Sequence, residues 1–476
     1  MSAARFPLPA CLLLGCLFAV AGCGFRTYEP KPLDPARTAA ELNARSLESP
    51  ALRDYLQQRG VAVDPWPRTD WTLTELTWVA LYHAPELDIA RSQVAVARAA
   101  EVTAAQRPNP AVQFGGQHHS QTTGEKTSPW TVSLVLDLPI VTGGKREARL
   151  AQAQALSDGA LLDLAAAAWF TRTRVQARYI DAHAAAEEVR LAHGEVALRR
   201  EELAMLERRL ERGFASAAEV AGARTRLAES QLVAARIAAR DLETRAALAQ
   251  ALGVPTQSVS RLTLTFADFT AAPALESGVD LRSAALQNRL DIRRGLADYA
   301  VAEAALRLEV ARQYPDVILR PGYLWDQGDR IWALGSILFL PLANRNEGPI
   351  LEAEARRDLE ADRFLALQAR TIATVEARQV GYTAALAEAD AAAAVQRDAL
   401  DRAARTKRRF DAGDADRLEW TRVRLESIAV ERAALASRVR GLQARAALED
   451  AVQAPLDGTP APVADPVMPR LAVDAR

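Results

Sequence analysis

Three aspartates, Asp411, Asp414 and Asp416, surround Gly413 in the second half of the chain. If several copies of the chain surround a pore, these groups would form rings of carboxylates that favour cations at a constriction. Helix capping is the alternative for Asp414, because aspartate is a preferred residue at the start of a helix. The three carboxylates are therefore a candidate acidic constriction with a competing structural explanation.

Two arginine pairs stand just before glycines at equivalent places in the chain. Residues 208–209 precede Gly213, and residues 408–409 precede Gly413. The guanidinium groups either bond across neighbouring helices and hold the turn closed, or they are solvated. Both explanations remain open at the level of the sequence.

An export signal precedes Cys23. Arg5 is followed by an apolar run over residues 8–21, and small residues stand directly before the cysteine in Val20-Ala21-Gly22-Cys23. This pattern describes a secretory leader, and it resembles a bacterial lipobox that is cut before Cys23. The cysteine thiol would then be diacylated, with ~0.8 kcal/mol of membrane affinity per buried CH₂. An ordinary signal peptide with a chance cysteine is the alternative.

The other two cysteines, Cys11 and Cys16, lie inside this expected leader. The mature chain would therefore keep one thiol, which excludes a disulfide framework. Gly24, directly after the cysteine, resembles the residue found in lipoproteins that are sorted to the outer membrane.

Catalytic and cofactor motifs are missing from the sequence. We find no P-loop, no metal-ligand cluster and no nucleophile motif, so we expect no enzyme activity, no cofactor and no resident metal. His118 and His119 would bind a cation or, as the alternative, stand solvated in a loop. The net charge of -1 and the absence of a basic run argue against nucleic acid as a partner.

Two long stretches without proline dominate the chain, residues 140–254 and 350–454. Both are rich in the strong helix formers Ala, Leu, Glu and Arg, and each is broken near its middle by a glycine in a similar setting, Gly213 or Gly413. A Glu follows each glycine by six residues and an Arg by eleven, at a constant offset of 200 residues between the stretches. This offset indicates an internal duplication and predicts two long helical hairpins.

Each of the expected long helices is far longer than a globular core is wide. A helix over about 146–212 would span on the order of 100 Å. A coiled-coil seam with 3-then-4 spacing runs from Leu425 to Ala446, and Arg432 is its single charged interruption. Such helices need further helices to complete their packing. A solvated structural rod is the alternative.

Two short segments have a period of two instead of 3.6. Trp130–Leu138 alternates apolar and polar residues opposite a partner strand in Ala111–Gln117, and Pro110 and Pro139 close the far ends. The second half repeats this pattern over about 317–340. Strands of this length with one apolar and one polar face suit a transmembrane barrel, and a small soluble hairpin is the alternative.

Four strands cannot close a barrel, and an open sheet edge is not tolerated in lipid. We therefore expect several copies of the chain to share one barrel. The expected fold class is mainly α with membrane β, built from a duplicated unit of helix, β-hairpin and long helical hairpin.

The expected organisation assigns every part of the chain to a segment. A leader (1–22) is followed by an extended lead-in (23–70) with a lipid anchor and a short helix over about 36–58. The first repeat (71–254) contains a β-hairpin at about 111–139 and a helical hairpin at about 146–252, and a linker with a short strand (255–277) follows it. The second repeat (278–454) contains a β-hairpin at about 317–340 and a helical hairpin at about 350–450, and a disordered tail (455–476) ends the chain.

The duplicated layout, the lipobox and the strand-ending prolines together resemble the TolC-like outer membrane efflux family over about 71–448. The resemblance implies a homotrimer with a twelve-stranded barrel, continued by a periplasmic helical tunnel. It also implies a periplasmic adaptor that docks at the hairpin tips around Gly213 and Gly413, and an inner-membrane pump of the resistance-nodulation-division (RND) type.

Local motifs resemble the cobalt-zinc-cadmium branch of this family. They are residues 107–110 (Arg-Pro-Asn-Pro), 138–146 and 344–348. Multidrug members share the same skeleton, so heavy-metal cations and drugs both remain open as exported substrates. A periplasmic adaptor lipoprotein and a structural coiled-coil lipoprotein are the alternatives to an efflux channel.

Overall fold

The structure is a computed structural model that describes residues 26–121, 124, 127–260, 262–265 and 280–456. The expected leader, Cys23 and residues 457–476 of the expected tail lie outside the described residues. The chain divides into two compact units, Met1–Arg45 and Ser46–Arg476.

The first unit contains one described helix, α2 (Pro35–Asn43). It begins at Asp34, whose carboxylate accepts hydrogen bonds from the backbone N–H groups of Ala36 and Arg37. The short helix that we expected over about 36–58 is thus two helices, because α3 (Pro50–Gln58) belongs to the second unit and starts anew at a proline.

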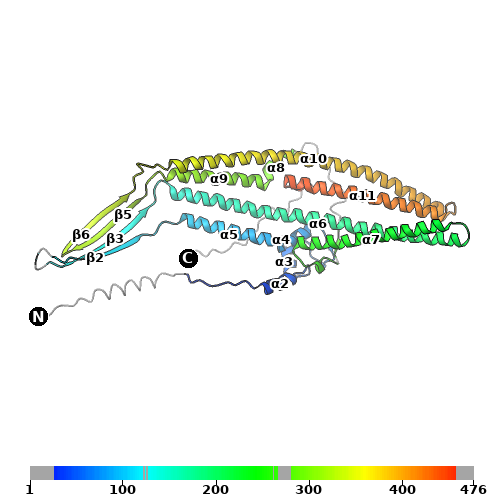
Figure 1. The fold of residues 1–476 in the computed structure, drawn as a ribbon, viewed down its shortest axis with the longest axis horizontal. Helices are drawn as coiled ribbons and strands as arrows, with labels where there is room; N and C mark the ends of the chain where they lie inside the picture. Colours follow the sequence, from blue (N-terminus) through cyan, green and yellow to red (C-terminus); the bar gives the residue numbers. More distant parts are fainter. Residues whose placement is uncertain (1–25, 122–123, 125–126, 261, 266–279, 457–476) are drawn as a thin grey trace. The chain divides into compact units, whose positions relative to one another are not determined.

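The second unit contains the same series of elements twice (Figure 1). This confirms the duplicated unit of helix, β-hairpin and long helical hairpin. The first series is α4 (Leu73–His83), α5 (Pro85–Ala105), β2 (Ala111–His118), β3 (Trp130–Ile140), α6 (Lys145–Glu211) and α7 (Ala217–Leu252); the second is α8 (Leu281–Asn288), α9 (Leu290–Ala311), β5 (Val317–Asp326), β6 (Asp329–Leu338), α10 (Glu347–Asp411) and α11 (Arg417–Val452).

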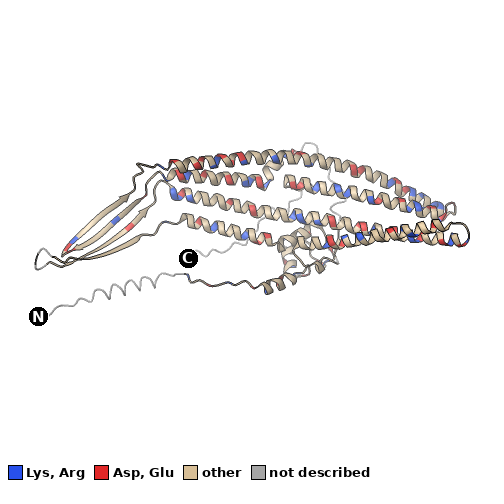
Figure 2. Ribbon diagram, viewed as in Figure 1, with Lys and Arg blue, Asp and Glu red and all other residues tan. Residues whose placement is uncertain are grey.

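Local sequence signals explain several helix ends. Thr72 and Glu75 form a capping box at the start of α4, in which each side chain accepts the other residue's backbone N–H. Helix α4 ends at Ala84, and Pro85 begins α5, where its missing N–H is not needed. The long helices carry charges of both signs along their length (Figure 2).

The helical segment before the second β-hairpin is broken into α8 and α9 at Arg289, which is extended. Tertiary contacts cause this break. The Arg289 guanidinium donates to Asp291 at 2.9 and 2.5 Å and to the carbonyl of Ala451 at 2.8 Å. The side-chain oxygen of Gln453 accepts the backbone N–H of Leu290 at 2.6 Å.

The two β-hairpins form one antiparallel sheet with the strand order β2-β3-β5-β6. The join between the hairpins is β3 against β5, where Leu134 faces Tyr323 and Ile140 faces Val317. A turn through Gln327 and Gly328, both with positive φ, connects β5 to β6. Strands β2 and β6 are the two edges of this sheet within the described chain.

A small structure packs against the middle of the first helical hairpin. The linker strand β4 (Thr263–Leu264) pairs in parallel with β1 (Asp70–Trp71), as the alternation in the linker suggested. The buried Tyr179 of α6 donates its hydroxyl to the carbonyl oxygen of Thr265 at 2.6 Å. Around it lies the largest apolar cluster, which includes Leu52, Leu56, Leu76, Val175, Leu248 and Leu252.

The long helices lie in a row. Between the middle of the unit and the hairpin tips the order is α7, α6, α11 and α10, and toward the sheet it is α5, α6, α9 and α10 (Figure 1). Helix α6 therefore sits inside the row in both halves, whereas α10 lies at one end and α5 and α7 at the other. None of the described helices is both long and apolar enough to cross a membrane.

Candidate functional site

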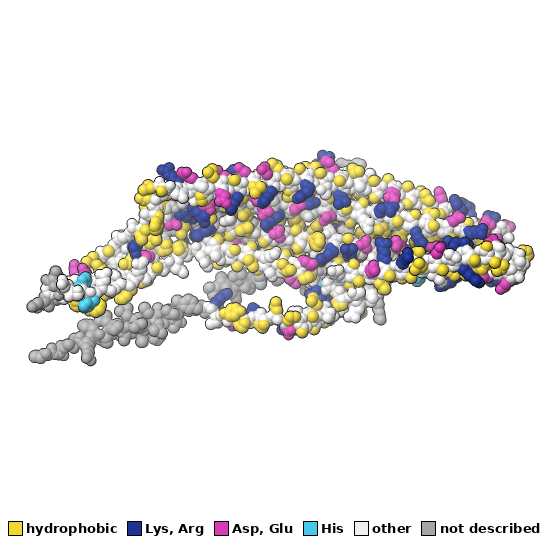
Figure 3. Space-filling model, in the orientation of Figure 1, with side chains coloured by type: hydrophobic (Ala, Val, Ile, Leu, Met, Phe, Trp, Pro, Cys, Tyr) yellow, Lys and Arg dark blue, Asp and Glu magenta, His cyan; other side chains and the backbone are white. Residues whose placement is uncertain are grey.

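The four-stranded sheet has an apolar face that is exposed in the single chain. Neighbouring strands align their apolar side chains: Phe114 lies opposite Leu134, and Tyr323 lies opposite Trp332 with ring centroids 4.9 Å apart. On β6, Trp332 and Leu334 are 82% and 80% exposed. In Figure 3, charged side chains of both signs cover the visible helices, and fewer lie over the sheet. A face of this kind requires lipid or protein against it.

The opposite face of the sheet is polar and internally bonded. The Arg320 guanidinium donates to the Asp137 carboxylate at 2.7 Å and to the side-chain oxygen of Gln113 at 2.9 Å. The Gln113 amide donates to Asp137 at 2.8 Å. This triad joins β2, β3 and β5, so the polar face holds the two hairpins together.

The two adjacent histidines of the first hairpin point to different partners. The His118 ring packs edge-on against the Trp130 ring, with 4.8 Å between the ring centroids, and the His119 ring nitrogen lies 2.8 Å from the Thr131 hydroxyl. Because the two rings engage different partners, this arrangement disfavours a shared cation. No group of three or more His, Cys, Asp or Glu side chains within the described part of the chain has the geometry of a metal site.

The hairpin turns are centred on Gly213 and Gly413, whose φ angles are +76° and +84°. This left-handed conformation suits glycine, which has no Cβ. Phe214, directly after the first glycine, is 80% exposed. At the second turn, Phe410 instead stacks on Trp420 at 6.0 Å. The two tips have the same backbone but present different chemistry.

The three aspartates at the second tip have different roles. Asp416, and not Asp414, is the N-cap of α11, because its carboxylate accepts the backbone N–H of Leu418. Asp411 forms an ion pair with Lys407. The carboxylate of Asp414 is exposed and makes no hydrogen bond or ion pair with another described residue. Sequence reasoning placed the cap two residues too early.

The side chain of Asp416 also reaches the other hairpin, where it forms an ion pair with Arg209. Burial raises the pKa of Asp416, but the hydrogen bond from Leu418 and the Arg209 guanidinium outweigh this and hold the pKa below its ordinary value. Arg409, the equivalent of Arg209, bonds within its own hairpin to Glu419 at 3.0 Å. One arginine of each pair is therefore bonded, and of these two, Arg209 bonds to the other hairpin, whereas Arg409 does not.

Farther from the tips along the helices, further ion pairs connect α6 with α11. Arg417 donates to Glu201 at 3.3 Å, and Arg432 donates to Glu195 at 2.7 Å. Arg432 is the charged interruption of the coiled-coil seam, so its partner on α6 explains why a charge is tolerated there. A charge at a seam position was the sequence signal for a partner across this interface.

A buried network that the sequence did not reveal fixes the C-terminal end of α11. Glu449 is 1% exposed and accepts hydrogen bonds from Gln176 at 2.9 Å and Arg445 at 2.9 Å, with the Arg172 guanidinium at 3.4 Å. Beside it, the Trp169 indole donates to Asp450 at 2.8 Å. Burial of a charge requires such partners, and here they join the first repeat to the second.

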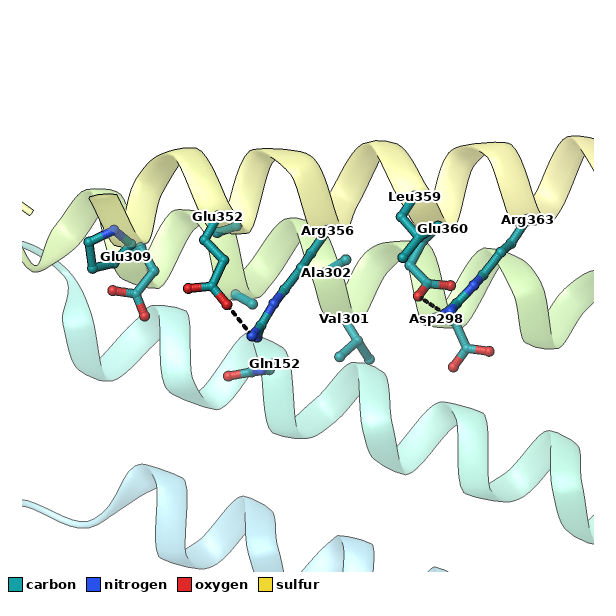
Figure 4. Close-up of a pocket in the computed structure, with 13 residues that line it drawn as sticks. Gln152, Asp298, Val301, Ala302, Glu309, Glu352, Arg356, Leu359, Glu360 and Arg363 are labelled. Carbon is teal, nitrogen blue, oxygen red and sulfur yellow. Dashed lines mark hydrogen bonds and ion pairs between the residues drawn. The ribbon is translucent and has the colours of Figure 1, made fainter. Parts of the chain in front are cut away.

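A groove of about 640 Å³ runs between α9 and α10, with Gln152 of α6 on its wall (Figure 4). Its four carboxylates are each engaged by an arginine. Glu352 pairs with Arg356 and Glu360 with Arg363, as Figure 4 shows. The other two pairs are Asp298 with Arg294 and Glu309 with Arg312. The walls of the groove are therefore ion-paired within the chain.

Solved structures share the fold of this chain. The outer membrane protein VceC of Vibrio cholerae superposes with a TM-score of 0.64 at 20% identity, over 81% of this chain and 96% of VceC. The CmeC outer membrane channel of Campylobacter jejuni gives a TM-score of 0.64 at 15% identity, over 80% of this chain and 85% of CmeC. The fold is that of TolC-like outer membrane channels.

Sequence comparison agrees with the fold. Residues 78–254 match the family described as Outer membrane efflux protein. A relative named Cobalt-zinc-cadmium resistance protein CzcC, from Cupriavidus metallidurans, is 27% identical over 243 residues. That match covers 51% of this chain and 57% of CzcC, so the chain spans about half the length of this curated relative.

Proposed function

We propose that the protein is the outer membrane channel of a tripartite efflux system, a passive exit duct for substrates that an inner-membrane pump delivers. One observation supports this most directly. A single sheet with one apolar and one polar face continues into a row of long helices, and both the sheet and the row are open at both ends. A ring of copies closes both at once, with lipid outside the sheet and water inside.

The open ends favour a rotational ring. Strand β2 with α5 and α7 lies at one end of the chain's wall, and β6 with α10 lies at the other. A contact between two different edges is heterologous and builds a closed ring when the rotation closes. Four strands per chain and the TolC-like fold support three copies and a twelve-stranded barrel.

We assign the sheet to the outer membrane and the helices to the periplasm. The relatives of matching fold include a protein described as an outer membrane channel. Lipid attachment at Cys23 is part of the proposal and rests on the leader pattern in the sequence. The direct test is mass spectrometry of the mature N-terminus, which should show an acylated Cys23.

The partners would be a periplasmic adaptor and an RND-type pump in the inner membrane. The tips around Gly213 and Gly413 are the proposed docking sites, because they are the exposed ends of the hairpins far from the sheet. Of the proposed acidic constriction, Asp414 is the carboxylate free to face a pore, since Asp411 and Asp416 are paired inside the chain.

Heavy-metal cations are the proposed substrates, supported by the name of CzcC and by the local motifs of the metal branch. The test is deletion of the gene, followed by growth in zinc, cobalt and cadmium and, as the comparison, in a panel of drugs. Sensitivity to metals alone supports metal export. Sensitivity to drugs alone would overturn this assignment and leave the channel intact.

The channel itself is tested by reconstitution. The purified chain should have the native mass of three copies in detergent and should conduct ions in a planar bilayer. A soluble monomer without conductance would contradict the proposal and favour a structural lipoprotein. A periplasmic adaptor is disfavoured by the four-stranded amphipathic sheet, which joins two hairpins from separate repeats.

A further inference from the structure

The internal duplication supplies a template for a contact that a single chain cannot make. Within one chain, α11 of the second repeat packs against α6 of the first. The equivalent pair is α7, which corresponds to α11, and α10, which corresponds to α6. These two helices lie at opposite ends of the row α7, α6, α11 and α10, so they meet only between copies (Figure 1).

The equivalence can be set residue by residue at an offset of 200. Helices α7 and α11 both have 36 residues and begin and end 200 positions apart. Residues 175–178 read Val-Gln-Ala-Arg, and residues 375–378 read Val-Glu-Ala-Arg. Val175 and Val375 are both 0% exposed, so the alignment also holds in the packing.

The seam of α11 and its counterpart on α7 differ in burial. In α11 the seam residues are buried or half-buried against the neighbouring helices, whereas their counterparts on α7 are exposed, except Ala246, which is half-buried. Leu442, for example, is 6% exposed and its counterpart Leu242 is 68% exposed. The seam is Leu425, Ile428, Arg432, Leu435, Val439, Leu442 and Ala446; its counterparts are Thr225, Ala228, Leu232, Ala235, Ala239, Leu242 and Ala246.

The facing surfaces of α6 and α10 differ in the same way. On α6, Leu191 packs in an apolar cluster with Ile428 and Leu435 of α11, and Glu195 bonds Arg432. The counterparts of Leu191 and Glu195 are Ala391 and Val395, which are both exposed. Exposed alanines on α7 and α10 leave room for the two backbones to approach closely.

One position changes chemistry on both sides together. Within the chain, Glu195 pairs with Arg432. Their counterparts, Val395 and Leu232, are both apolar and are 56% and 54% exposed. A simultaneous change of a charge pair into an apolar pair is the pattern expected when the two positions face each other, since either change alone would leave a charge against an apolar side chain.

We propose that α7 of one copy packs against α10 of the next copy in the arrangement of α11 on α6, with Leu232 against Val395. This inference rests on the proposed channel and adds its residue-level interface. The joints around the helical wall then alternate. The joint within each chain carries ion pairs, and the joint between chains is apolar.

The test is cross-linking of paired cysteines with a short bifunctional maleimide in the assembled, full-length protein. The variant with Leu232→Cys and Val395→Cys should lose its monomer band and run as linked copies on a denaturing gel. The matched control, Glu195→Cys with Arg432→Cys, should link within one chain and stay at the monomer position. The unmodified chain, which retains Cys23, controls for the native thiol.

The outcomes separate this inference from the proposed function. A protein with the native mass of three copies whose 232–395 pair stays at the monomer position, while its control pair reacts, would overturn the interface and leave the channel standing. A native mass of one copy would overturn the channel proposal itself.

A second measurement does not depend on cysteines. Val395→Glu alone should lower the temperature at which the trimer dissociates, because it places a charge against Leu232. Adding Leu232→Arg creates an ion pair like that of Glu195 with Arg432 within the chain. The double variant should regain most of the lost dissociation temperature. Additive loss in the double variant would show that the two side chains do not meet.

Discussion

At the second hairpin turn, one carboxylate begins a helix and also holds a neighbouring hairpin. Asp416 accepts the backbone N–H of Leu418 and pairs with Arg209. Its counterpart in the first repeat, Ser216, forms a capping box with Glu219 instead. The two side chains keep the same capping role, and only the aspartate adds a charge that reaches across to α6.

The lowered pKa of Asp416 makes a prediction about pH. A carboxylate with a lowered pKa in the folded state stabilises the fold above its ordinary pKa of 3.8, and this contribution is lost as the pH falls through the folded-state value. Asp416→Asn keeps the helix cap but removes the charge. The melting temperature of the variant should therefore fall below that of the unmodified protein at neutral pH, and the two should converge in acid. A constant difference across the pH range would contradict the role of the charge.

The buried Glu449 gives a second prediction at this scale. Glu449→Gln leaves the Arg172 and Arg445 guanidinium groups buried without a carboxylate, which should cost roughly 3–5 kcal/mol. The matched control is Glu388→Gln, because Glu388 bonds Arg440 at the surface of the second hairpin, and we expect little change from it. Chemical unfolding of the detergent-solubilised variants measures both. Equal midpoints for the two variants would show that the buried network does not join the repeats.

At the scale of the elements, the duplication was visible in the sequence, and the contacts between distant elements were not. The capping box at Thr72, the helical hairpins and the strand periods follow from local spacing. The break at Arg289 does not, because it depends on Ala451 and Gln453 from the end of α11. The pairing of β3 with β5 likewise joins residues far apart in the chain, and no local pattern selects it.

The triad on the polar face of the sheet predicts the ion selectivity of the proposed channel. Arg320→Met would leave the Asp137 carboxylate without its cation in each copy, so the reversal potential in a salt gradient should shift toward cation selectivity. Asp137→Asn should shift it toward anions, because Arg320 is then unpaired. Planar bilayer recordings measure both signs. Shifts in the same direction for the two variants would place the triad outside the conducting path.

At the scale of the whole molecule, the single chain forms a four-stranded sheet and a row of helices, and neither closes on itself. The exposed side chains of Trp332 and Leu334 lie on the apolar face of the sheet, and both sheet edges lack a strand partner in the described chain. In the proposed channel, lipid covers that face and other copies of the chain pair with the edges.

The lipid-facing assignment is testable with neighbouring residues on β6. Leu334→Lys places a charge on the apolar face, which costs about 2–4 kcal/mol near the middle of a bilayer. Ala333→Lys, one residue away, lies on the opposite face and should be tolerated. The amount of assembled protein in washed outer membranes should fall for the first variant only. An equal yield of both variants would contradict the assignment of the faces.

The sequence alone determined where the long helices and the β-hairpins lie, because periodicity, capping residues and proline positions act within a few residues of each other. The 200-residue offset likewise indicated two equivalent halves. Only the tertiary structure decided which helices meet, which carboxylate at the second tip is paired, and that α7 and α10 keep uncovered faces. The physical reason is distance along the chain: Arg209 and Asp416, or Glu195 and Arg432, act on each other only after the two hairpins have packed.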